Sequence, residues 1–572
     1  MLYFSQIRLK FKIFSFSLIL GWFLFSGLAF AQQKSFEFIP AETPYILVYT
    51  MQPELLDSLP ESIPQIKQEQ VDKEKQPAAK MMLSMLKDWL HHLDKRTLTE
   101  LGLKNLDEFQ ASIFGLGLWP VMSLAISDQK KFTRWVAKNA KQAGMNVQLK
   151  GKIMMFVSTT LPFKVVMSLR DRKWMNIALV PDVHAKEMLP YITGKKVPSN
   201  PLSKDTSFKT KTQDMGINTQ NMMYVDIERL VRMFLGKGEG VNKHFALIDD
   251  QQFKNLPESC VADYLDLTKH FPYFIFGQSS NRSKDGFRGR AVLRLSSPVA
   301  QVAQTFVGQS TYSTNSSGAV VQLNLNFNIK AILNGLQQLF QHYIQKPFTC
   351  PNLAKRANPQ KLQMLSSQIM IVPPFLFDLK GISLKLAELQ PLPKGQVIIS
   401  ANNVMNLINI AKQMKPNFAQ IQLPAVGAPA QKIVGPFPPN LDLKVEIKEG
   451  ALGLATGEKH SKELSTILAD KPIAKPPLFQ ISYDIDKIIE SFTGYLNKVK
   501  QITKVAEEER YKMEVEIAKA EGKEPPPPPA TKDQMDESLN MLKEHQFGLV
   551  TVQSTFTTEG MVSEIIVSNK KK

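Results

Sequence analysis

Residues 223–232 read "MYVDIERLVR", and three later stretches follow the same pattern: "NFNIKAILNG" from Asn326, "SANNVMNLIN" from Ser400 and "SYDIDKIIES" from Ser482. In each, strand-like residues lead to an Asp or Asn, then to Ile or Val, with further apolar residues three and four positions beyond. An Asp or Asn oxygen can accept hydrogen bonds from the first amides of a helix, and this apolar spacing marks one helical face. Each stretch therefore predicts a strand that runs into an N-capped helix, with the caps at Asp226, Asn328, Asn403 and Asp484.

A second pattern follows each of these helices: an apolar strand, a turn centred on glycine and another strand. A charged residue precedes each glycine, which suits a tight hairpin turn with positive φ, and the turns are predicted at Gly286, Gly381, Gly450 and Gly560. One helix on a two-stranded hairpin cannot bury its apolar face alone, so several units must pack side by side. We therefore expect an α+β fold of repeated helix–β-hairpin units, which form two-layer antiparallel sheets covered by helices, in two or more lobes.

These patterns also suggest domain boundaries. The apolar stripe of the last helix fades after Val505 and five prolines follow, which predicts a projecting helical hairpin at 500–546. Residues 60–80 are polar and interrupted by prolines, which predicts a mobile surface loop. The expected parts are a signal peptide at 1–31, an N-terminal α+β lobe at 32–204, α+β units at 205–312 and 313–414, a Pro-rich apolar loop at 415–440, and a C-terminal α+β unit at 441–572 that carries the hairpin.

The first 31 residues have the three parts of an export signal. Arg8, Lys10 and Lys12 form a basic start, a 16-residue apolar run follows, and Ala29 and Ala31 supply the small residues of a cleavage site. This run is short for a membrane span of about 20 residues, which favours cleavage. We expect a mature chain that does not span the membrane and lies in the bacterial periplasm; an uncleaved inner-membrane anchor and secretion are the alternatives.

The net charge of +18 is spread along the chain, and subtraction of the three basic residues of the signal leaves +15 (18 minus 3). No basic stripe with interleaved aromatic residues stands out, and nucleic acid is not an expected partner of an exported protein. The charge favours at most a modest attraction to anionic envelope surfaces, and it equally fits general solubility.

Two cysteines in an oxidising compartment predict a disulfide between Cys260 and Cys350. Each cysteine opens a predicted helix at a comparable place in consecutive units, so the bond would join neighbouring units. Two buried free thiols are the alternative.

The segment 415–440 contains six prolines, two lysines and no acidic residue. Such a composition is too apolar for a disordered linker. The segment either packs on its own domain, which we favour, or contacts an envelope protein or lipid. The candidate contact residues are Phe418, Ile421, Leu423, Val426 and Phe437.

Motifs that carry chemistry are weak throughout. Ser84 and Lys87 have the S-x-x-K spacing of penicillin-binding proteins, but a convincing downstream K-T-G is missing. Asp88 and His92 lie one helical turn apart, where an ordinary hydrogen-bonded helical pair is a better explanation than a metal site. We therefore expect no catalytic residue, no cofactor and no metal site.

Two short sequence features near the start of the predicted mature chain resemble features of a known group of proteins. Pro40, Ala41, Glu42 and Thr43 precede a predicted strand, and a later helix begins with the pattern Asp-x-x-x-Phe at Asp128–Phe132. In these features the N-terminal third resembles a group of bacterial periplasmic proteins that carry a domain of unknown function, which usually have Asp where this chain has Glu42. The resemblance implies an exported α+β protein and supplies no catalytic residue.

Together these observations predict a non-enzymatic periplasmic scaffold or binding protein that acts on an envelope partner. The second expectation is a carrier or sensor of a lipid or another apolar ligand. The third is an enzyme whose active site is assembled from residues scattered along the sequence.

Overall fold

The structure is a computed structural model. It describes residues 34–50, 68–73, 77–105, 108–150, 153–157, 163–171, 173–244, 256–279, 286–309, 311–369, 371–389, 393–415, 420–433, 441–491, 493, 509–516 and 548–568.

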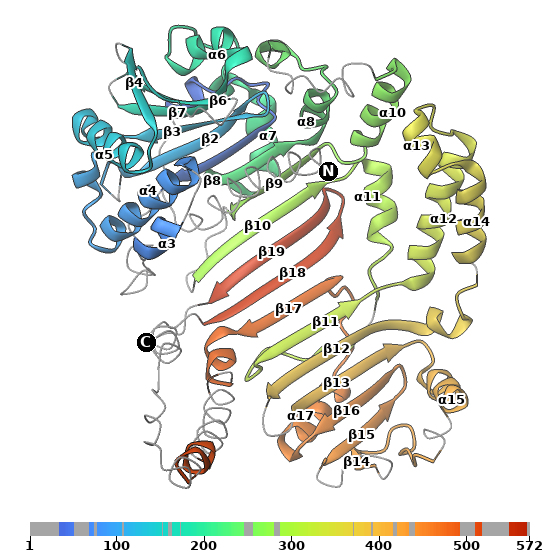
Figure 1. The fold of residues 1–572 in the computed structure, drawn as a ribbon. Helices are drawn as coiled ribbons and strands as arrows, with labels where there is room; N and C mark the ends of the chain where they lie inside the picture. Colours follow the sequence, from blue (N-terminus) through green and yellow to red (C-terminus); the bar gives the residue numbers. More distant parts are fainter. Residues whose placement is uncertain are drawn as a thin grey trace.

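The described strands form one continuous sheet of 19 strands, and every pair in it is antiparallel (Figure 1). The N-terminal half of the sheet runs, from its outer edge inward, through β4 (Asn146–Lys150), β5 (Ile153–Val157), β6 (Phe163–Arg170), β7 (Trp174–Pro181), β3 (Trp119–Ala125), β2 (Gln110–Leu116), β1 (Tyr45–Thr50), β8 (Ile217–Asp226), β9 (Tyr273–Ser279) and β10 (Gly286–Arg294).

The C-terminal half continues the same sheet from β10 outward. Its strands are β19 (Gly560–Ser568), β18 (Leu549–Thr557), β17 (Phe479–Asp484), β11 (Val321–Asn326), β12 (Leu379–Glu388), β13 (Lys394–Ala401), β16 (Ala451–Thr456), β15 (Leu443–Lys448) and β14 (Gln431–Lys432). The two halves meet where β10 pairs with β19. The α+β class and the antiparallel pairing agree with the sequence-based expectation, but the strands lie in a single sheet.

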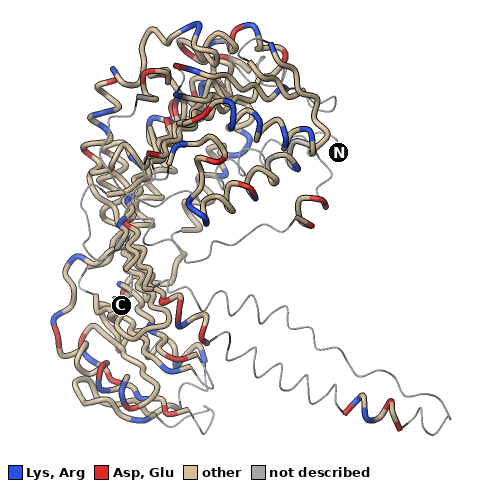
Figure 2. The backbone as a smooth tube through the Cα atoms, turned by 90° about the vertical axis from the view of Figure 1, so that its left-hand side faces the viewer, with Lys and Arg blue, Asp and Glu red and all other residues tan. Residues whose placement is uncertain are grey.

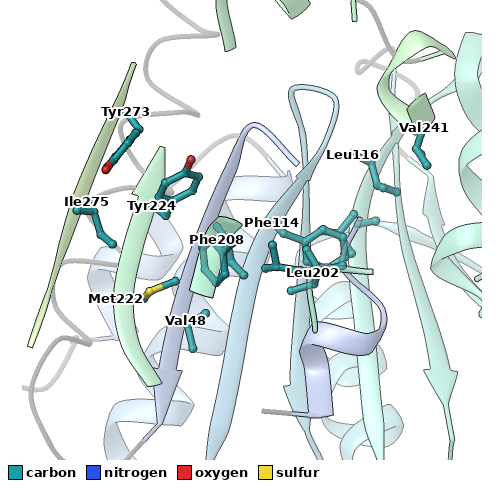
Figure 3. Packing of buried hydrophobic residues seen from close by; sticks show 14 of the residues in the cluster. Val48, Phe114, Leu116, Leu202, Phe208, Met222, Tyr224, Val241, Tyr273 and Ile275 are labelled. Atoms are coloured by element: carbon teal, nitrogen blue, oxygen red, sulfur yellow. The ribbon is translucent and has the colours of Figure 1, made fainter. Parts of the chain in front are cut away.

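Helices cover both faces of the N-terminal half, because alternate strand residues point to opposite faces and both sets are apolar. Helices α4 (Pro77–Asp94) and α5 (Gln129–Gln142) supply Met81, Phe132 and Val136 to the core of one face. Helices α6 (Ala185–Ile192) and α7 (Thr206–Asp214) supply Met188 and Phe208 to the other. Figure 3 shows this second core, in which Phe208 lies against Tyr224 of β8, with ring centroids 5.4 Å apart.

The C-terminal half has less helical cover. Helix α15 and the segment 420–433 pack on one face of its outer strands, and helix α17 packs on the opposite face. Helices α12 and α14 pack against each other beside the sheet (Figure 1). The remaining helix bounds are α3 (Gln68–Lys73), α8 (Ile227–Phe234), α10 (Glu258–Thr268), α11 (Ser297–Gln304), α12 (Ile329–Gln345), α13 (Pro351–Arg356), α14 (Pro359–Ile369), α15 (Val404–Met414) and α17 (Glu458–Ala469).

The four predicted helix caps are confirmed. In each case a side-chain oxygen of the Asx residue accepts a hydrogen bond from the backbone amide three residues later, where a new helix has an unsatisfied donor. The bonds are Arg229 N to Asp226 at 3.0 Å, Ala331 N to Asn328 at 3.0 Å, Asn406 N to Asn403 at 3.0 Å and Lys487 N to Asp484 at 3.2 Å.

Two adjacent asparagines allow a matched test of such a cap. Asn403→Ala removes the bond to the Asn406 amide, and we expect it to lower the free energy of unfolding by about 1 kcal/mol. The control is Asn402→Ala, which leaves the cap of α15 intact and should change that free energy by less than about 0.5 kcal/mol. Chemical denaturation of both variants checks the difference, and equal losses would contradict a capping role.

The predicted turns have mixed outcomes. Gly450 has a φ of 83° between β15 and β16, and Gly560 has a φ of 126° at the start of β19, as hairpin turns require. Gly286 is the first residue of β10, and the turn before it lies outside the described residues. The prediction for Gly381 is wrong, because this residue lies inside β12 beside an irregularity in the strand register. There a Cβ would meet the Leu325 carbonyl oxygen at 2.6 Å, so a close backbone approach requires the glycine.

Two other segment predictions can be compared with the structure. The mobile loop predicted at 60–80 is wrong in part, because Gln68–Lys73 and the start of α4 are helical and Val71 is buried. The signal peptide lies outside the described residues, and so does the projecting hairpin except for a helical stretch at 509–516. Within the part of the chain that the structure describes, no helix is both long and apolar enough for a membrane span.

Candidate functional site

A layer of polar side chains lies buried on one face of the C-terminal half. Cross-strand pairing places Ser482, Gln322, Lys385 and Gln396 in one row across β17, β11, β12 and β13. Each of these four residues is at most 2% exposed, and so are Asn324 and Ser383 in the neighbouring row. Burial of so many polar groups is costly unless each finds a hydrogen-bond partner.

The partners come from the segment between helix α11 and β11 and from helix α17. The Thr314 amide donates to Ser383 Oγ at 2.8 Å, and the Gln322 side chain donates to the Thr314 carbonyl. Lys385 Nζ lies 2.5 Å from Glu463 Oε1 of α17, and Gln396 Nε2 donates to the other Glu463 oxygen at 2.9 Å. This segment and α17 therefore cover the polar layer.

Glu463 is ionised at neutral pH. Its partial burial disfavours the charge, but the hydrogen bond and charge of Lys385, with a contribution from His460, outweigh that effect and lower the pKa of Glu463. Lys385 has a side chain only 3% exposed, so this carboxylate neutralises a buried ammonium group. The cluster has the arrangement of a structural ion pair.

The opposite face of the same strands is apolar and only half-buried. The residues that alternate with the polar layer include Leu323 and Leu325 of β11, Ile382 and Leu384 of β12, Ile481 of β17 and Val552 of β18. These six residues are called the apolar face from here on. All are half-buried, and none belongs to a buried core cluster of the described residues.

Little of the described chain covers the apolar face. Helix α11 packs on β18 and β19 near one end of these strands, but no described helix packs closely on β11 or β17. Figure 1 shows β10, β19, β18, β17, β11 and β12 face-on, with no helix in front of them. Polar residues are thus inside and apolar residues partly outside, the reverse of the usual arrangement. Contiguous apolar surface that is only half-buried makes this face a candidate docking surface.

The sequence contained a weak signal for this reversal. The polar positions of "VQLNLN" at Val321–Asn326 are occupied by Gln and Asn, and those of β12 and β17 include Ser383 and Ser482. A solvent-facing strand surface usually carries more charged residues than these. Uncharged amides and hydroxyls, which a few hydrogen bonds can satisfy, indicated burial, but the alternation alone did not show which face is covered.

The predicted contact residues of 415–440 have separate environments. Ile421 is buried in the core with Val404 and Val445, and Leu423 packs against that core. The segment therefore packs on its own domain at these two residues, which is the alternative that the sequence analysis favoured. Val426 is 51% exposed. Phe418 and Phe437 lie outside the described residues.

The two cysteines lie at disulfide distance, as predicted. Their sulfur atoms are 2.11 Å apart, and both residues are buried. Cys260 belongs to α10 of the N-terminal half and Cys350 precedes α13 of the C-terminal half. Asp263 of α10 also accepts hydrogen bonds from the Thr349 and Cys350 amides, both at 2.7 Å. The two halves are therefore joined at this point as well as through the sheet.

Another cluster of titratable residues lies beside β8. Tyr224 donates to Asp226 at 3.1 Å, and Lys211 Nζ lies 3.3 Å from the Tyr224 hydroxyl oxygen. Burial, with a contribution from Asp226, raises the pKa of Tyr224, so the phenol stays protonated. The adjoining cavity encloses about 10 Å³, at most the room of a single water. It leaves no space for a substrate.

The residues with weak catalytic patterns have ordinary partners. Asp88 accepts hydrogen bonds from Trp135 Nε1 at 2.9 Å and Asn139 Nδ2 at 3.1 Å, and His92 contacts Thr97 at 2.8 Å. Ser84 is buried and donates to Asn139. Among the residues placed in the structure, no group of three His, Cys, Asp or Glu side chains could hold a metal ion.

Comparisons with protein-family models, with curated proteins and with solved structures found no match to this chain. The class of protein therefore follows from the fold and the apolar face alone: an α+β protein whose described strands form a single long antiparallel sheet, part of which carries a half-buried apolar face.

Proposed function

We propose that this chain is a non-enzymatic binding protein of the bacterial envelope, and that an apolar surface of a partner protein docks on the apolar face. The observation that carries the proposal is the reversed sheet, in which Lys385 and Gln322 are buried while Leu323 and Ile481 are only half-buried. Apolar surface gains about 25 cal/mol for each Å² removed from water. A partner that covers this face would therefore bind with a favourable hydrophobic contribution.

The shape of the site favours a protein over a lipid. The apolar face extends across β18, β17, β11 and β12 without an enclosing wall of described helices. Neighbouring strands lie about 4.8 Å apart, so these four strands present a broad open surface, which suits a protein partner. A single acyl chain would be covered on one side only, whereas small-ligand sites are usually concave. A carrier or sensor of lipid is the second candidate.

Several features support an exported scaffold. The cysteine pair suits an oxidising compartment, and the predicted signal would direct the chain to the periplasm. Basic and acidic residues are intermixed along the described chain in Figure 2, so general solubility is the simplest reading of the net charge. The four strand-to-helix caps support repeated helix–hairpin units grouped in lobes, and kinship with the periplasmic group remains part of the proposal.

Photocrosslinking in cells tests the docking site. A photoreactive amino acid replaces Ile481 or Leu384 on the apolar face, and a control probe replaces Leu149, which is 72% exposed on the outer strand β4. We expect both face positions to yield an adduct with the same protein, and the control position to yield none. Lipid adducts would favour the second candidate, and adducts within the chain would show that the protein covers its own face.

Binding of the identified partner provides the quantitative check. Ile481→Asp places a charge in the centre of the docking surface, and we expect it to weaken binding at least tenfold, or about 1.4 kcal/mol. Leu149→Asp is the matched control and should leave affinity unchanged. Circular dichroism must show that both variants fold. Unchanged affinity of folded Ile481→Asp would contradict the proposal.

A further inference from the structure

The two halves of the sheet have the same strand order. Counted outward from the β10–β19 junction, the N-terminal half has β10, β9, β8, β1, β2, β3, β7, β6 and β5, and the C-terminal half has β19, β18, β17, β11, β12, β13, β16, β15 and β14. In each half the fourth strand from the junction comes first along the chain. The chain then visits the corresponding strands in the same sequence, and β4 is an addition at the N-terminal edge.

The strand registers give a residue-by-residue correspondence from a single starting match. If Asp226 matches Asp484, the neighbouring pairs Val225–Tyr45 and Tyr483–Val321 match Tyr45 with Val321, and hence Leu47 with Leu323. The cross-strand pairs of β2 and β12 then extend the correspondence, so that Met122 of β3 matches Val397 of β13. Six residues further along the chain from Met122 and Val397, beyond the ends of β3 and β13, stand Asp128 and Asn403, and each caps the helix that follows.

The paired residues can also be followed from β8 and β17 towards the β10–β19 junction. Asp226 pairs with Tyr273 and Asp484 pairs with Leu549, which matches β9 with β18. The pairs Ile275–Val292 and Thr551–Ile566 then match β10 with β19. Six residues earlier stand Gly286 and Gly560, the first residue of each strand. The single match of Asp226 with Asp484 therefore also aligns a second pair of helix caps and the first glycines of β10 and β19. Neither pair was used to set the match.

Backbone hydrogen bonds around the starting residues agree with this correspondence. The Asp226 amide donates to the Pro44 carbonyl at 2.9 Å, and the Asp484 amide donates to the Val320 carbonyl at 3.0 Å. Pro44 and Val320 immediately precede the matched residues Tyr45 and Val321. The local sequences "DIERLVRMFLG" from Asp226 and "DIDKIIESFTG" from Asp484 share Asp, Ile, Phe and Gly at the same positions.

The pairing between β10 and β19 is symmetric under the same correspondence. Gly286 faces Ser568 and Arg294 faces Gly560, so matched residues exchange places across the junction. Such reciprocity defines an isologous interface, the kind that a two-fold axis produces between identical subunits. The axis passes through the pair Arg290–Glu564, whose members occupy matched positions. We infer that the β10–β19 junction is an isologous interface between two copies of one ancestral half-chain, now fused through α11 and the segment that follows it.

The residues at the axis fit a fused dimer. In a homodimer the residue on the axis faces itself, and an Arg would face another Arg, a destabilising cross-strand pair. Fusion permits different residues, and here Arg290 hydrogen-bonds Glu559 at 2.9 Å while Arg288 hydrogen-bonds Glu564 at 2.7 Å. The bond between Cys260 and Cys350 also joins one half to the other.

Reciprocal strand exchange in the full chain tests the inference. In one variant the sequences of residues 286–294 and 560–568 change places. If a two-fold axis relates the two strands, this exchange preserves every residue pair between them. A second variant carries the 286–294 sequence at both places and sets Arg opposite Arg at the axis. We expect a smaller fall in melting temperature for the reciprocal exchange than for the single transplant. An equal or larger fall would overturn the inference.

Cysteine pairs give an independent readout if the exchanged strands do not fold. Arg288→Cys with Ile566→Cys and Val292→Cys with Val562→Cys lie two residues to either side of the axis. We expect both pairs to oxidise in similar yield, mapped by mass analysis of peptides with the native disulfide retained. The mismatched pair Arg288→Cys with Val562→Cys should not crosslink. Crosslinking of only one matched pair, or of the mismatched pair, would contradict an isologous junction.

Discussion

Removal of the disulfide should lower the free energy of unfolding by about 4–5 kcal/mol in the chain-entropy description. Cys260 and Cys350 are 90 residues apart in sequence, so the bond closes a long loop that is open in the unfolded chain without it. The bond also joins helix α10 of the N-terminal half to the start of helix α13 in the C-terminal half. Denaturant unfolding of a Cys260→Ala/Cys350→Ala variant measures the loss. Alanine is the suitable replacement because both sites are buried and a serine hydroxyl would need a partner.

Two controls isolate the crosslink from the packing of the sulfur atoms. The wild type should lose a similar amount of stability in a reducing agent, whereas the double-alanine variant should not respond to it. The hydrogen bonds from the Thr349 and Cys350 amides to Asp263 are retained in the variant, because they use backbone donors. A loss below about 1 kcal/mol would mean that the unfolded chain gains little freedom when the bond is absent.

Local features of the fold could be predicted from the sequence because they depend on neighbouring residues. The caps at Asp226 and Asn403 follow from an Asx residue beside a helical apolar pattern, and the turns at Gly450 and Gly560 follow from a glycine after a charged residue. Gly381 shows the limit of this reasoning. Its neighbours resemble those of the true turns, but the backbone of β11 approaches it too closely for any side chain.

The single sheet and the exposed face could not be predicted in this way. The pairing of β10 with β19 joins residues between 266 (Arg294 and Gly560) and 282 (Gly286 and Ser568) positions apart, and no local pattern encodes such a contact. The alternation in β11 predicted a strand with one polar and one apolar face. It did not show that the segment around Thr314 and the helix around Glu463 cover the polar one. The candidate site therefore emerged from the tertiary structure.

Replacement of Glu463 by glutamine should cost about 3–5 kcal/mol of folding free energy, the usual effect of removing one partner of a buried ion pair. Lys385 would then keep only neutral acceptors, the glutamine amide oxygen and Asn315 Oδ1 at 3.2 Å, and its nearly fully buried ammonium would lose its counter-charge. The polar layer under the apolar face depends on this contact, since Glu463 also receives the Gln396 side chain. Denaturant unfolding measures the loss. Lys385→Met with Glu463→Leu is the matched control, and it should lose less because no buried charge is left.

Acid titration provides a second readout of the same pair. Because the pKa of Glu463 is lower in the folded state, its ionisation contributes stability above the ordinary glutamate pKa of about 4.3. This contribution is lost as the pH falls through the lowered folded-state value. The wild type should therefore lose more stability than Glu463→Gln between about pH 5 and the acid limit of folding. Parallel pH profiles, or a loss below about 1 kcal/mol at neutral pH, would show that the ion pair does not stabilise the polar layer.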